Sequence, residues 1–99
     1  MQIDNIDLGT LQQNKKHNFV ALVRNDKNFP ITVTRIKVGC SSCTEATIRK
    51  FTIQPKEDVL MDVKYTPFTV GPHDKYIKVY YTENNVPLEY TFTFKATVK

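Results

Sequence analysis

The chain has 99 residues and a formal charge of +4, from 14 Lys and Arg against 10 Asp and Glu. This length supports one hydrophobic core and therefore a single domain, residues 1–99, and excludes a second domain. The 10 Val, 7 Ile and 12 Thr residues far outnumber the 3 Ala and 5 Leu. This balance favours strands and excludes a helix bundle, and the aromatic content of 11% excludes a disordered chain.

The first part of the chain contains three segments with strand patterns. The opening strand is expected over Ile3–Leu8. Phe19–Val23 is apolar on both faces, which predicts a central strand that is buried on both sides of its sheet. Phe29–Val38 changes the parity of its apolar residues halfway, and this change predicts a β-bulge near Thr34 and Arg35.

Loops and strands alternate through the middle of the chain. Gly39–Thr44 is expected to be a loop and Ala46–Ile53 a strand, and the proline in Gln54–Glu57 predicts a tight turn. The alternation of apolar and polar residues then predicts a strand over Asp58–Tyr65. Two prolines in Thr66–Asp74 predict a long loop that connects one sheet edge to another.

The last two strands form the clearest pair. Tyr76–Tyr81 and Leu88–Val98 both alternate strictly, and the polar segment Thr82–Pro87 between them supplies the turn of a hairpin. Seven short antiparallel strands in about 100 residues are typical of an immunoglobulin-like β-sandwich. The sequence therefore predicts an all-β fold of about seven strands.

A family resemblance covers nearly the whole chain. The segments that carry it are Ile6–Thr10, Phe19–Asn25, Val38–Thr44, Ile53–Glu57, Val63–Pro67 and Gly71. In this order they resemble a family of bacterial immunoglobulin-like domains of unknown function with a Cys-Gly-Cys-Thr signature. That family also carries an Ile-x-Pro-Gly-Glu turn, a Val-x-Phe-x-Pro strand end and a Gly that opens the next strand.

The resemblance implies a binding role. The family is similar to the major-sperm-protein-like and the cilia- and centrosome-associated sandwich domains, which act in scaffolding and binding rather than in catalysis. This sequence departs from the family in two ways: its cysteines, Cys40 and Cys43, are spaced Cys-x-x-Cys, and the usual export signal is missing. The second departure favours a free-standing intracellular or virion-associated copy, as among the accessory proteins of tailed phages.

Other segments bear on location and cofactors. Met1–Asp7 lacks the basic and apolar regions of a signal peptide, and no run approaches the roughly 18 apolar residues that span a bilayer. We therefore expect a protein that is made in the cytoplasm and has no membrane partner. Only 3 glycines are present, too few for a phosphate-cradling loop, so no nucleotide cofactor is expected.

Cys40 and Cys43 form the sharpest motif, and four chemistries compete for it. A redox dithiol needs its first Cys at a helix N-terminus, whereas a loop and a strand follow here. A zinc site needs further ligands, and His17 and His73 lie far away in the sequence. A local disulfide would close a very short loop, and both thiols of an unexported protein are expected to stay reduced. The simplest interpretation is two small residues packing in a loop, with thiol redox or zinc binding as the alternative.

Tyr76, Lys78 and Tyr80 share one face of a predicted strand. This aromatic and basic stripe is typical of a platform for a protein or for single-stranded nucleic acid, and it is also ordinary on the outer face of an antiparallel strand. Because the charge of +4 is small and spread along the chain, nucleic acid is the second alternative rather than the first.

Catalytic residues are sparse. Asp58 and Asp62 lie on one strand face about 13 Å apart, too far for a general acid and nucleophile pair. Ser41 and Ser42 have no His and Asp at a motif spacing. The sequence therefore predicts a protein that is not an enzyme and uses no cofactor.

The function predicted from the sequence is a protein–protein interaction module. Its most concrete form is an accessory structural protein of a phage particle, such as a decoration, head or tail protein, with a capsid or tail assembly as the partner. The predicted partner-binding residues are Phe68, Val70, Tyr76, Lys78, Tyr80, Ser41 and Ser42.

Overall fold

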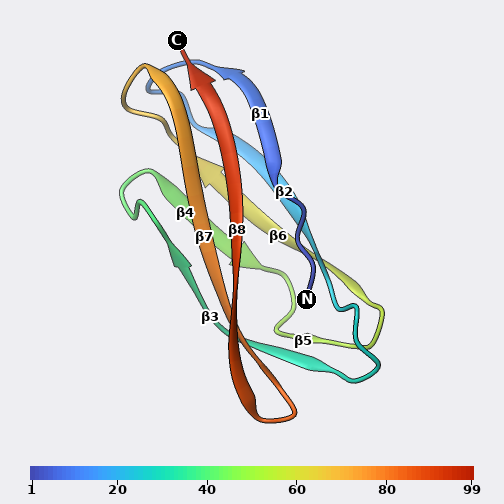
Figure 1. Ribbon diagram of the computed structural model, residues 1–99. Coiled ribbons are helices and arrows are strands. Elements are labelled where there is room, and N and C mark those ends of the chain that lie inside the picture. Colours follow the sequence, from blue (N-terminus) through green and yellow to red (C-terminus); the bar gives the residue numbers. More distant parts are fainter.

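The computed structural model describes residues 1–99 as two packed β-sheets (Figure 1). The strands are β1 (Ile6–Leu11), β2 (His17–Arg24), β3 (Ile31–Val38), β4 (Thr44–Ile48), β5 (Thr52–Ile53), β6 (Asp58–Tyr65), β7 (Gly71–Glu83) and β8 (Val86–Val98). The larger sheet has the order β1-β8-β7-β3-β5 and the smaller one the order β2-β6-β4. All pairs are antiparallel except β1 with β8. The predicted all-β sandwich is confirmed, with eight strands. No segment forms a helix of the length and apolarity that a membrane crossing needs.

The core lies between the sheets and contains 21 buried residues, of which every strand contributes at least one. Its centre is aromatic: the ring of Phe94 lies 5.2 Å from the ring of Phe19 and 5.1 Å from that of Tyr65, both edge to face, and 6.1 Å from Phe92. Such pairs add to the stabilisation from buried apolar area. Phe94 therefore links β8 of the large sheet to β2 and β6 of the small one.

The β7–β8 hairpin is the longest element, with 13 residues in each strand. Its predicted inward and outward faces are confirmed, since Ile77, Val79 and Tyr81 are buried. The turn is shorter than the predicted Thr82–Pro87, because Glu83 already pairs with Val86. Asn84 and Asn85 connect the strands with φ of 48° and 65°, the left-handed values that a two-residue hairpin turn requires and that Asn tolerates.

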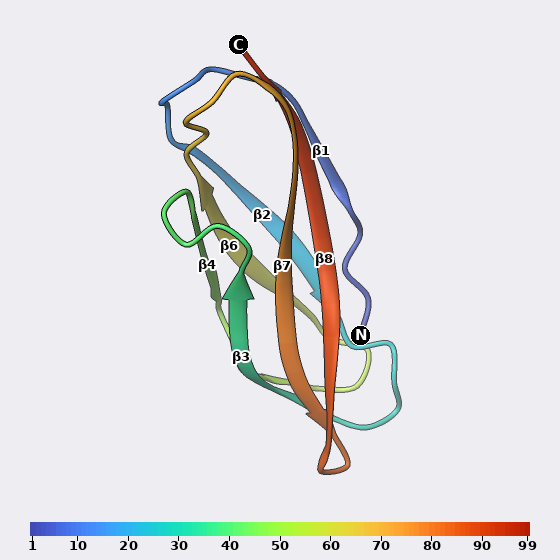
Figure 2. The ribbon, with the colours of Figure 1, turned by 60° about the vertical axis from the view of Figure 1, so that its left-hand side comes forward.

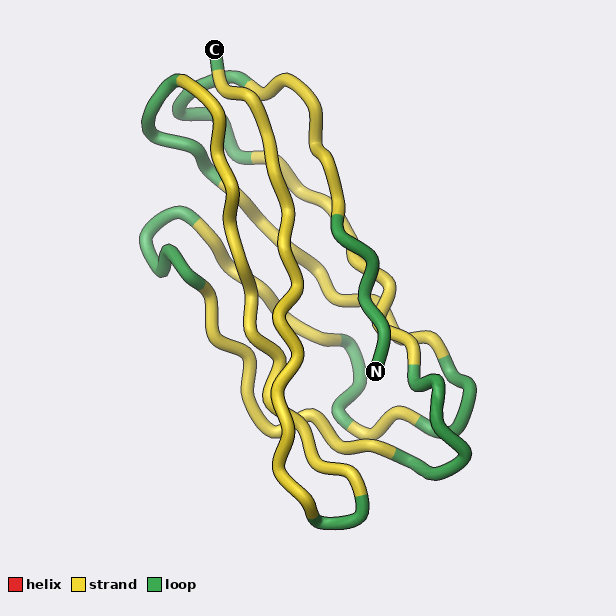
Figure 3. The backbone as a smooth tube through the Cα atoms, in the orientation of Figure 1, coloured by secondary structure: helices red, strands yellow, loops and turns green.

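β3 contains the predicted bulge. Its pairing with β7 shifts between Val33 and Arg35, which leaves Thr34 as the extra residue. The Thr34 hydroxyl donates a hydrogen bond of 3.2 Å to the carbonyl of Tyr80. Because a bulge increases local twist, β3 bends here, as the tube in Figure 3 shows.

Two of the predicted strands have different bounds in the structure. The segment Ala46–Ile53 is not one strand: β4 pairs with β6 in the small sheet, whereas β5 pairs with β3 in the large one. The chain crosses between the sheets at residues 49–51, and a local pattern does not reveal which sheet a strand joins. The opening strand is β1, displaced from the predicted Ile3–Leu8, because Gln2 bridges Arg24 of β2 before the chain crosses to β8.

The prediction that Phe19–Val23 is buried on both sides is wrong. β2 is an edge strand of the small sheet, and only one face of it meets the core. The side chains of Val20 and Leu22 on its other face are 48% and 47% exposed. A strand that is apolar on both faces has the same pattern whether its outer face is covered or open to solvent.

Lys56 occupies the third position of the turn Gln54–Glu57 with a φ of +64°. The turn closes through a 3.0 Å hydrogen bond from the amide of Glu57 to the carbonyl of Gln54. A side chain at left-handed φ is strained, whereas Gly adopts this conformation freely. We expect Lys56→Gly to raise the free energy of unfolding by about 0.5 to 1 kcal/mol in urea denaturation. Lys27→Gly, an exposed lysine outside any positive-φ position, is the control and should not stabilise.

Candidate functional site

The loop between β6 and β7 presents two apolar side chains to solvent. Phe68 is 52% exposed and Val70 is 61% exposed. The loop is held in place at three points: the amide of Thr66 donates to the carbonyl of Cys43 at 2.8 Å, the amide of Asn14 donates to Pro67, and the side-chain amide of Gln13 donates to Phe68. Phe68 and Val70 are therefore held outward on an ordered loop, and we call them the apolar loop pair.

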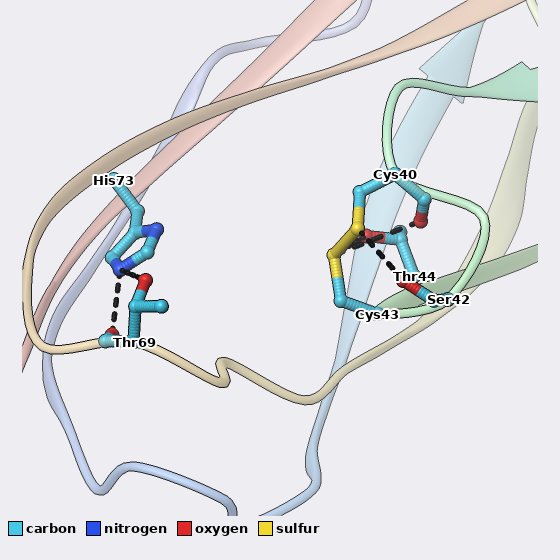
Figure 4. The surroundings of a disulfide bond; sticks show 6 residues. All are labelled: Cys40, Ser42, Cys43, Thr44, Thr69 and His73. Atoms are coloured by element: carbon cyan, nitrogen blue, oxygen red, sulfur yellow. Dashed lines mark hydrogen bonds between the residues drawn. A yellow bond between two sulfur atoms is a disulfide. The ribbon is translucent and has the colours of Figure 1, made fainter.

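This loop is shorter than predicted. The predicted loop reached Asp74, but residues 71–74 already belong to β7 and pair with β8. His73 lies in this first part of the strand, where its Nε2 atom is 2.8 Å from the carbonyl oxygen of Thr69 and 3.3 Å from the hydroxyl of the same residue (Figure 4). The side chain of His73 thus contributes to the position of the loop.

Cys40 and Cys43 are joined in a disulfide bond (Figure 4). The expectation that both thiols stay reduced is wrong for this structure. A tight turn explains the pairing: the amides of Cys43 and Thr44 both donate to the carbonyl of Cys40, and the two cysteine Cα atoms lie 5.5 Å apart, within the range that a disulfide spans. Cys43 is 7% exposed, whereas Ser41 and Ser42 at the tip of the turn are exposed.

The metal-binding alternative finds no ligand set in the structure. Nowhere do three or more His, Cys, Asp or Glu side chains gather closely enough to hold a metal ion. Zinc binds cysteine as the thiolate, and a disulfide offers none. His73 makes its contacts with Thr69 instead of with the cysteines.

The stripe Tyr76, Lys78 and Tyr80 lies on the outer face of β7, as the parity predicts. Tyr76 is 40% exposed, and its ring packs against Gly39, where an added Cβ would come within 2.8 Å of a ring carbon. The guanidinium of Arg35 lies 4.6 Å from the centre of the Tyr80 ring, a cation–π contact that covers one face of that ring. The stripe therefore contacts Gly39, next to the cysteine turn, through Tyr76, and it contacts Arg35 of β3 through Tyr80.

Two aspartates considered as catalytic candidates are held in ion pairs on the outer face of the small sheet. Asp58 accepts two hydrogen bonds from Arg24, and Asp62 accepts two from Arg49, with a shortest distance of 2.8 Å in each pair. These hydrogen bonds hold the pKa of each carboxyl below its ordinary value. Both groups are therefore ionised and neutralised by a fixed partner.

The lowered pKa values predict loss of stability in acid. The pKa of Glu57 is also lowered, first by the hydrogen bond from the amide of Gln54 and then by Lys50. A carboxyl with a lowered pKa in the folded state stabilises the protein above its unfolded pKa of about 4, and this stabilisation is lost as the pH falls through the folded pKa. The melting temperature should therefore fall between about pH 5 and pH 2. The double variant Asp58→Asn, Asp62→Asn should show a shallower fall, and an unchanged slope would contradict this assignment.

Sequence reasoning missed several surface features. The position of Arg35 over the ring of Tyr80 was not predicted, because it depends on how the bulge pairs β3 with β7. Phe51, 62% exposed, lies where the chain crosses between the sheets and was assigned to a strand. Val20 and Leu22 were assigned to the core. Each depends on which strands are neighbours, which the local pattern does not record.

Solved structures with the same fold come from several organisms. The Vibrio cholerae VesB protease has a TM-score of 0.80 and 12% identity, over 97% of this chain and 32% of that chain. A protein of unknown function from Porphyromonas gingivalis W83 has a TM-score of 0.76 and 15% identity, over 94% and 43%. A PapD-like domain of human CEP192 has a TM-score of 0.69 and 6% identity, over 99% and 84%. The chain thus spans less than half of the length of the first two.

These similarities establish the fold, which this chain shares with a PapD-like domain. No curated protein matches the sequence. A family model described as a protein of unknown function, DUF1573, matches residues 1–98. Because that match covers the chain from its first residue to its penultimate one, the chain belongs to the DUF1573 family.

Proposed function

We propose that this chain is a non-catalytic protein-interaction module, and more specifically an accessory structural protein of a phage particle. The observation that carries the proposal is the apolar loop pair, Phe68 and Val70, exposed on a loop that three hydrogen bonds hold in place. Ordered, exposed apolar side chains lose little conformational freedom when a partner covers them, so they serve well as anchors of an interface. The partner is a protein of the capsid or tail.

Two further features support a binding role without catalysis. Asp58 and Asp62 are each engaged by an arginine in an ion pair. The PapD-like architecture supports the proposal through its resemblance to scaffolding and binding domains.

The disulfide bears on location. We propose that the protein is made in the cytoplasm and then resides on the particle. Disulfides persist on virion surfaces and in other oxidising surroundings and are rare in the cytosol. The Cys40–Cys43 disulfide therefore supports exposure on a particle rather than permanent residence in the cytosol.

Cosedimentation with assembled particles tests this proposal. The tagged full chain should sediment with particles from the producing cells, and mass spectrometry of crosslinked species should identify a capsid or tail protein. The double variant Phe68→Ala, Val70→Ala should lose at least about tenfold in affinity, since truncating two anchors removes well over 1 kcal/mol. Phe51→Ala, which removes a ring that is also more than half exposed but lies elsewhere, is the control. A chain that stays free and monomeric beside particles would contradict the proposal.

A further inference from the structure

The part of β3 beyond the bulge, residues 35–38, is an open edge of the large sheet. β5 covers β3 only at Ile31 and Thr32, and the next contact is a hydrogen bond from the amide of Val33 to the carbonyl of Phe51. Beyond the bulge, β3 has a neighbour on one side only, β7. Figure 2 shows β3 beside β7 and ending at the loop that leads to β4.

The hydrogen-bonding groups on this edge belong to Ile36 and Val38. The amide of Gly39 donates to the carbonyl of Tyr76 at 3.0 Å, so Gly39 faces β7. Because successive residues of an antiparallel strand face opposite neighbours, Lys37 also faces β7 and the backbone groups of Ile36 and Val38 point away from it. Two amides and two carbonyls are therefore free to pair with another strand.

The side chains along the edge alternate in character. Arg35 and Lys37 are exposed on the outer face of the sheet, whereas Ile36 and Val38 are half-buried against the core. A shallow groove of about 540 Å³ follows this edge and is lined by Arg35, Ile36, Lys37, Val38, Gly39 and Ser41. On the outer face, Lys78 of β7 lies directly opposite Lys37, which adds a further positive charge.

We propose that this edge binds an extended acidic segment of a partner protein, which adds to the large sheet as a further strand. The inference rests on the proposed function and names the kind of partner segment. Residues of the added strand on the outer face would lie beside Arg35 and Lys37, where Asp or Glu is favoured. Residues on the inner face would lie beside Ile36 and Val38, where apolar side chains are favoured. The segment therefore alternates acidic and apolar residues.

Charge disfavours a second copy of this chain as the occupant in the two registers that pair Ile36 with Val38 or with Ile36. Pairing two copies with Ile36 opposite Val38 places the two Lys37 side chains together, and pairing Ile36 with Ile36 places Arg35 beside Lys37. Like charges directly opposite each other destabilise a strand pair. Positive charges and a bulge are also the means by which proteins protect an edge against self-association. An acidic strand meets the same charges as favourable partners.

The test uses the full chain and a blocked peptide of sequence Ser-Glu-Val-Glu-Val-Glu-Ser. We expect binding that weakens with added salt, and slower hydrogen exchange at the amides of Ile36 and Val38 in NMR spectra. A peptide with Lys in place of Glu should not bind. Binding without protection of these two amides, or no binding, would overturn the proposal.

A matched pair of variants isolates the edge. Val38→Pro removes one outward amide and should weaken binding by about tenfold or more, the equivalent of roughly 1.4 kcal/mol. Ala46→Pro makes the same change on the free edge of β4. The amide of Arg49 donates to the carbonyl of Leu60 in β6. Because successive residues face opposite sides, the amide of Ala46, three residues earlier, points away from β6. Ala46→Pro should leave the affinity within about twofold, and circular dichroism checks that both variants fold.

Charge reversal gives an independent test if the proline variant does not fold. The double variant Arg35→Glu, Lys37→Glu should lose the Glu peptide and gain the Lys peptide, because the preferred charge reverses with the edge. If the peptide fails to bind while the chain docks on particles through Phe68 and Val70, the inference falls and the proposed function stands. If the peptide protects Ile36 and Val38 while no particle binds, the edge is a binding site and the particle proposal falls.

Discussion

Phe94→Ala is expected to lower the free energy of unfolding by about 3 to 5 kcal/mol, the range for truncating a large buried aromatic side chain. Phe94 is 2% exposed and contacts aromatic rings from both sheets, Phe19 and Tyr65 among them. The truncation therefore leaves a cavity where the two sheets meet. Since small domains have only about 5 to 15 kcal/mol in total, we expect a large fraction of unfolded protein at 37 °C.

Urea denaturation followed by tyrosine fluorescence or circular dichroism measures this effect. Phe51→Ala is the control, because it removes the same ring from a side chain that is 62% exposed, and it should change the free energy of unfolding by less than about 0.5 kcal/mol. Similar losses for both variants would contradict the core that the structure describes.

Asn25→Ala is the second large effect, with an expected loss of about 3 kcal/mol. Asn25 is completely buried, and its side-chain amide donates to the carbonyls of Phe29, Ile53 and Gln54 at 2.8, 3.0 and 3.1 Å. Its side-chain oxygen accepts from the amide of Lys27. Alanine would remove this partner from the buried carbonyl of Ile53 and from the partly buried carbonyls of Phe29 and Gln54, and each unpaired buried group costs about 1 kcal/mol or more.

Asn28→Ala tests whether burial and hydrogen bonding are the cause. Asn28 is three residues away in the same turn and is exposed, so its truncation should cost less than about 0.5 kcal/mol. Because Asn25 connects the end of β2 to β5 and the following turn, Asn25→Ala should also accelerate hydrogen exchange at Ile53 and Glu57. Unchanged exchange there would show that Asn25 does not hold these segments together.

Some strands of this fold could be predicted from the pattern of neighbouring residues alone. β6, β7 and β8 were predicted because one face of each strand is buried and the other faces solvent. Apolar and polar residues therefore alternate along each of them with a period of two. The bulge in β3 was predicted for the same reason, since one extra residue reverses that period. The hydrogen bonds from the side chain of Asn25 to Ile53 and Gln54 were not predicted, because they join residues 28 and 29 positions apart.

Some features of the candidate site were likewise predicted from the sequence, and others were not. Exposure of Phe68, Val70 and Tyr76 was predicted from a proline-containing loop and from strand parity, and the structure has each of them exposed. The disulfide was not predicted, because the redox state of Cys40 and Cys43 depends on a turn geometry that the spacing alone does not specify. The open edge of β3 was not predicted either.

By itself, then, the sequence determined an all-β chain with a long C-terminal hairpin and with its apolar residues on defined faces. These properties are local, since the pleat of a strand and the conformations of Pro and Asn are set by neighbouring residues. The tertiary structure decided which strands are edges: β2 leaves Val20 and Leu22 in solvent, and β5 stops short of Ile36. Strand neighbours are chosen by contacts between residues far apart in the chain, and that choice places the surfaces available to a partner.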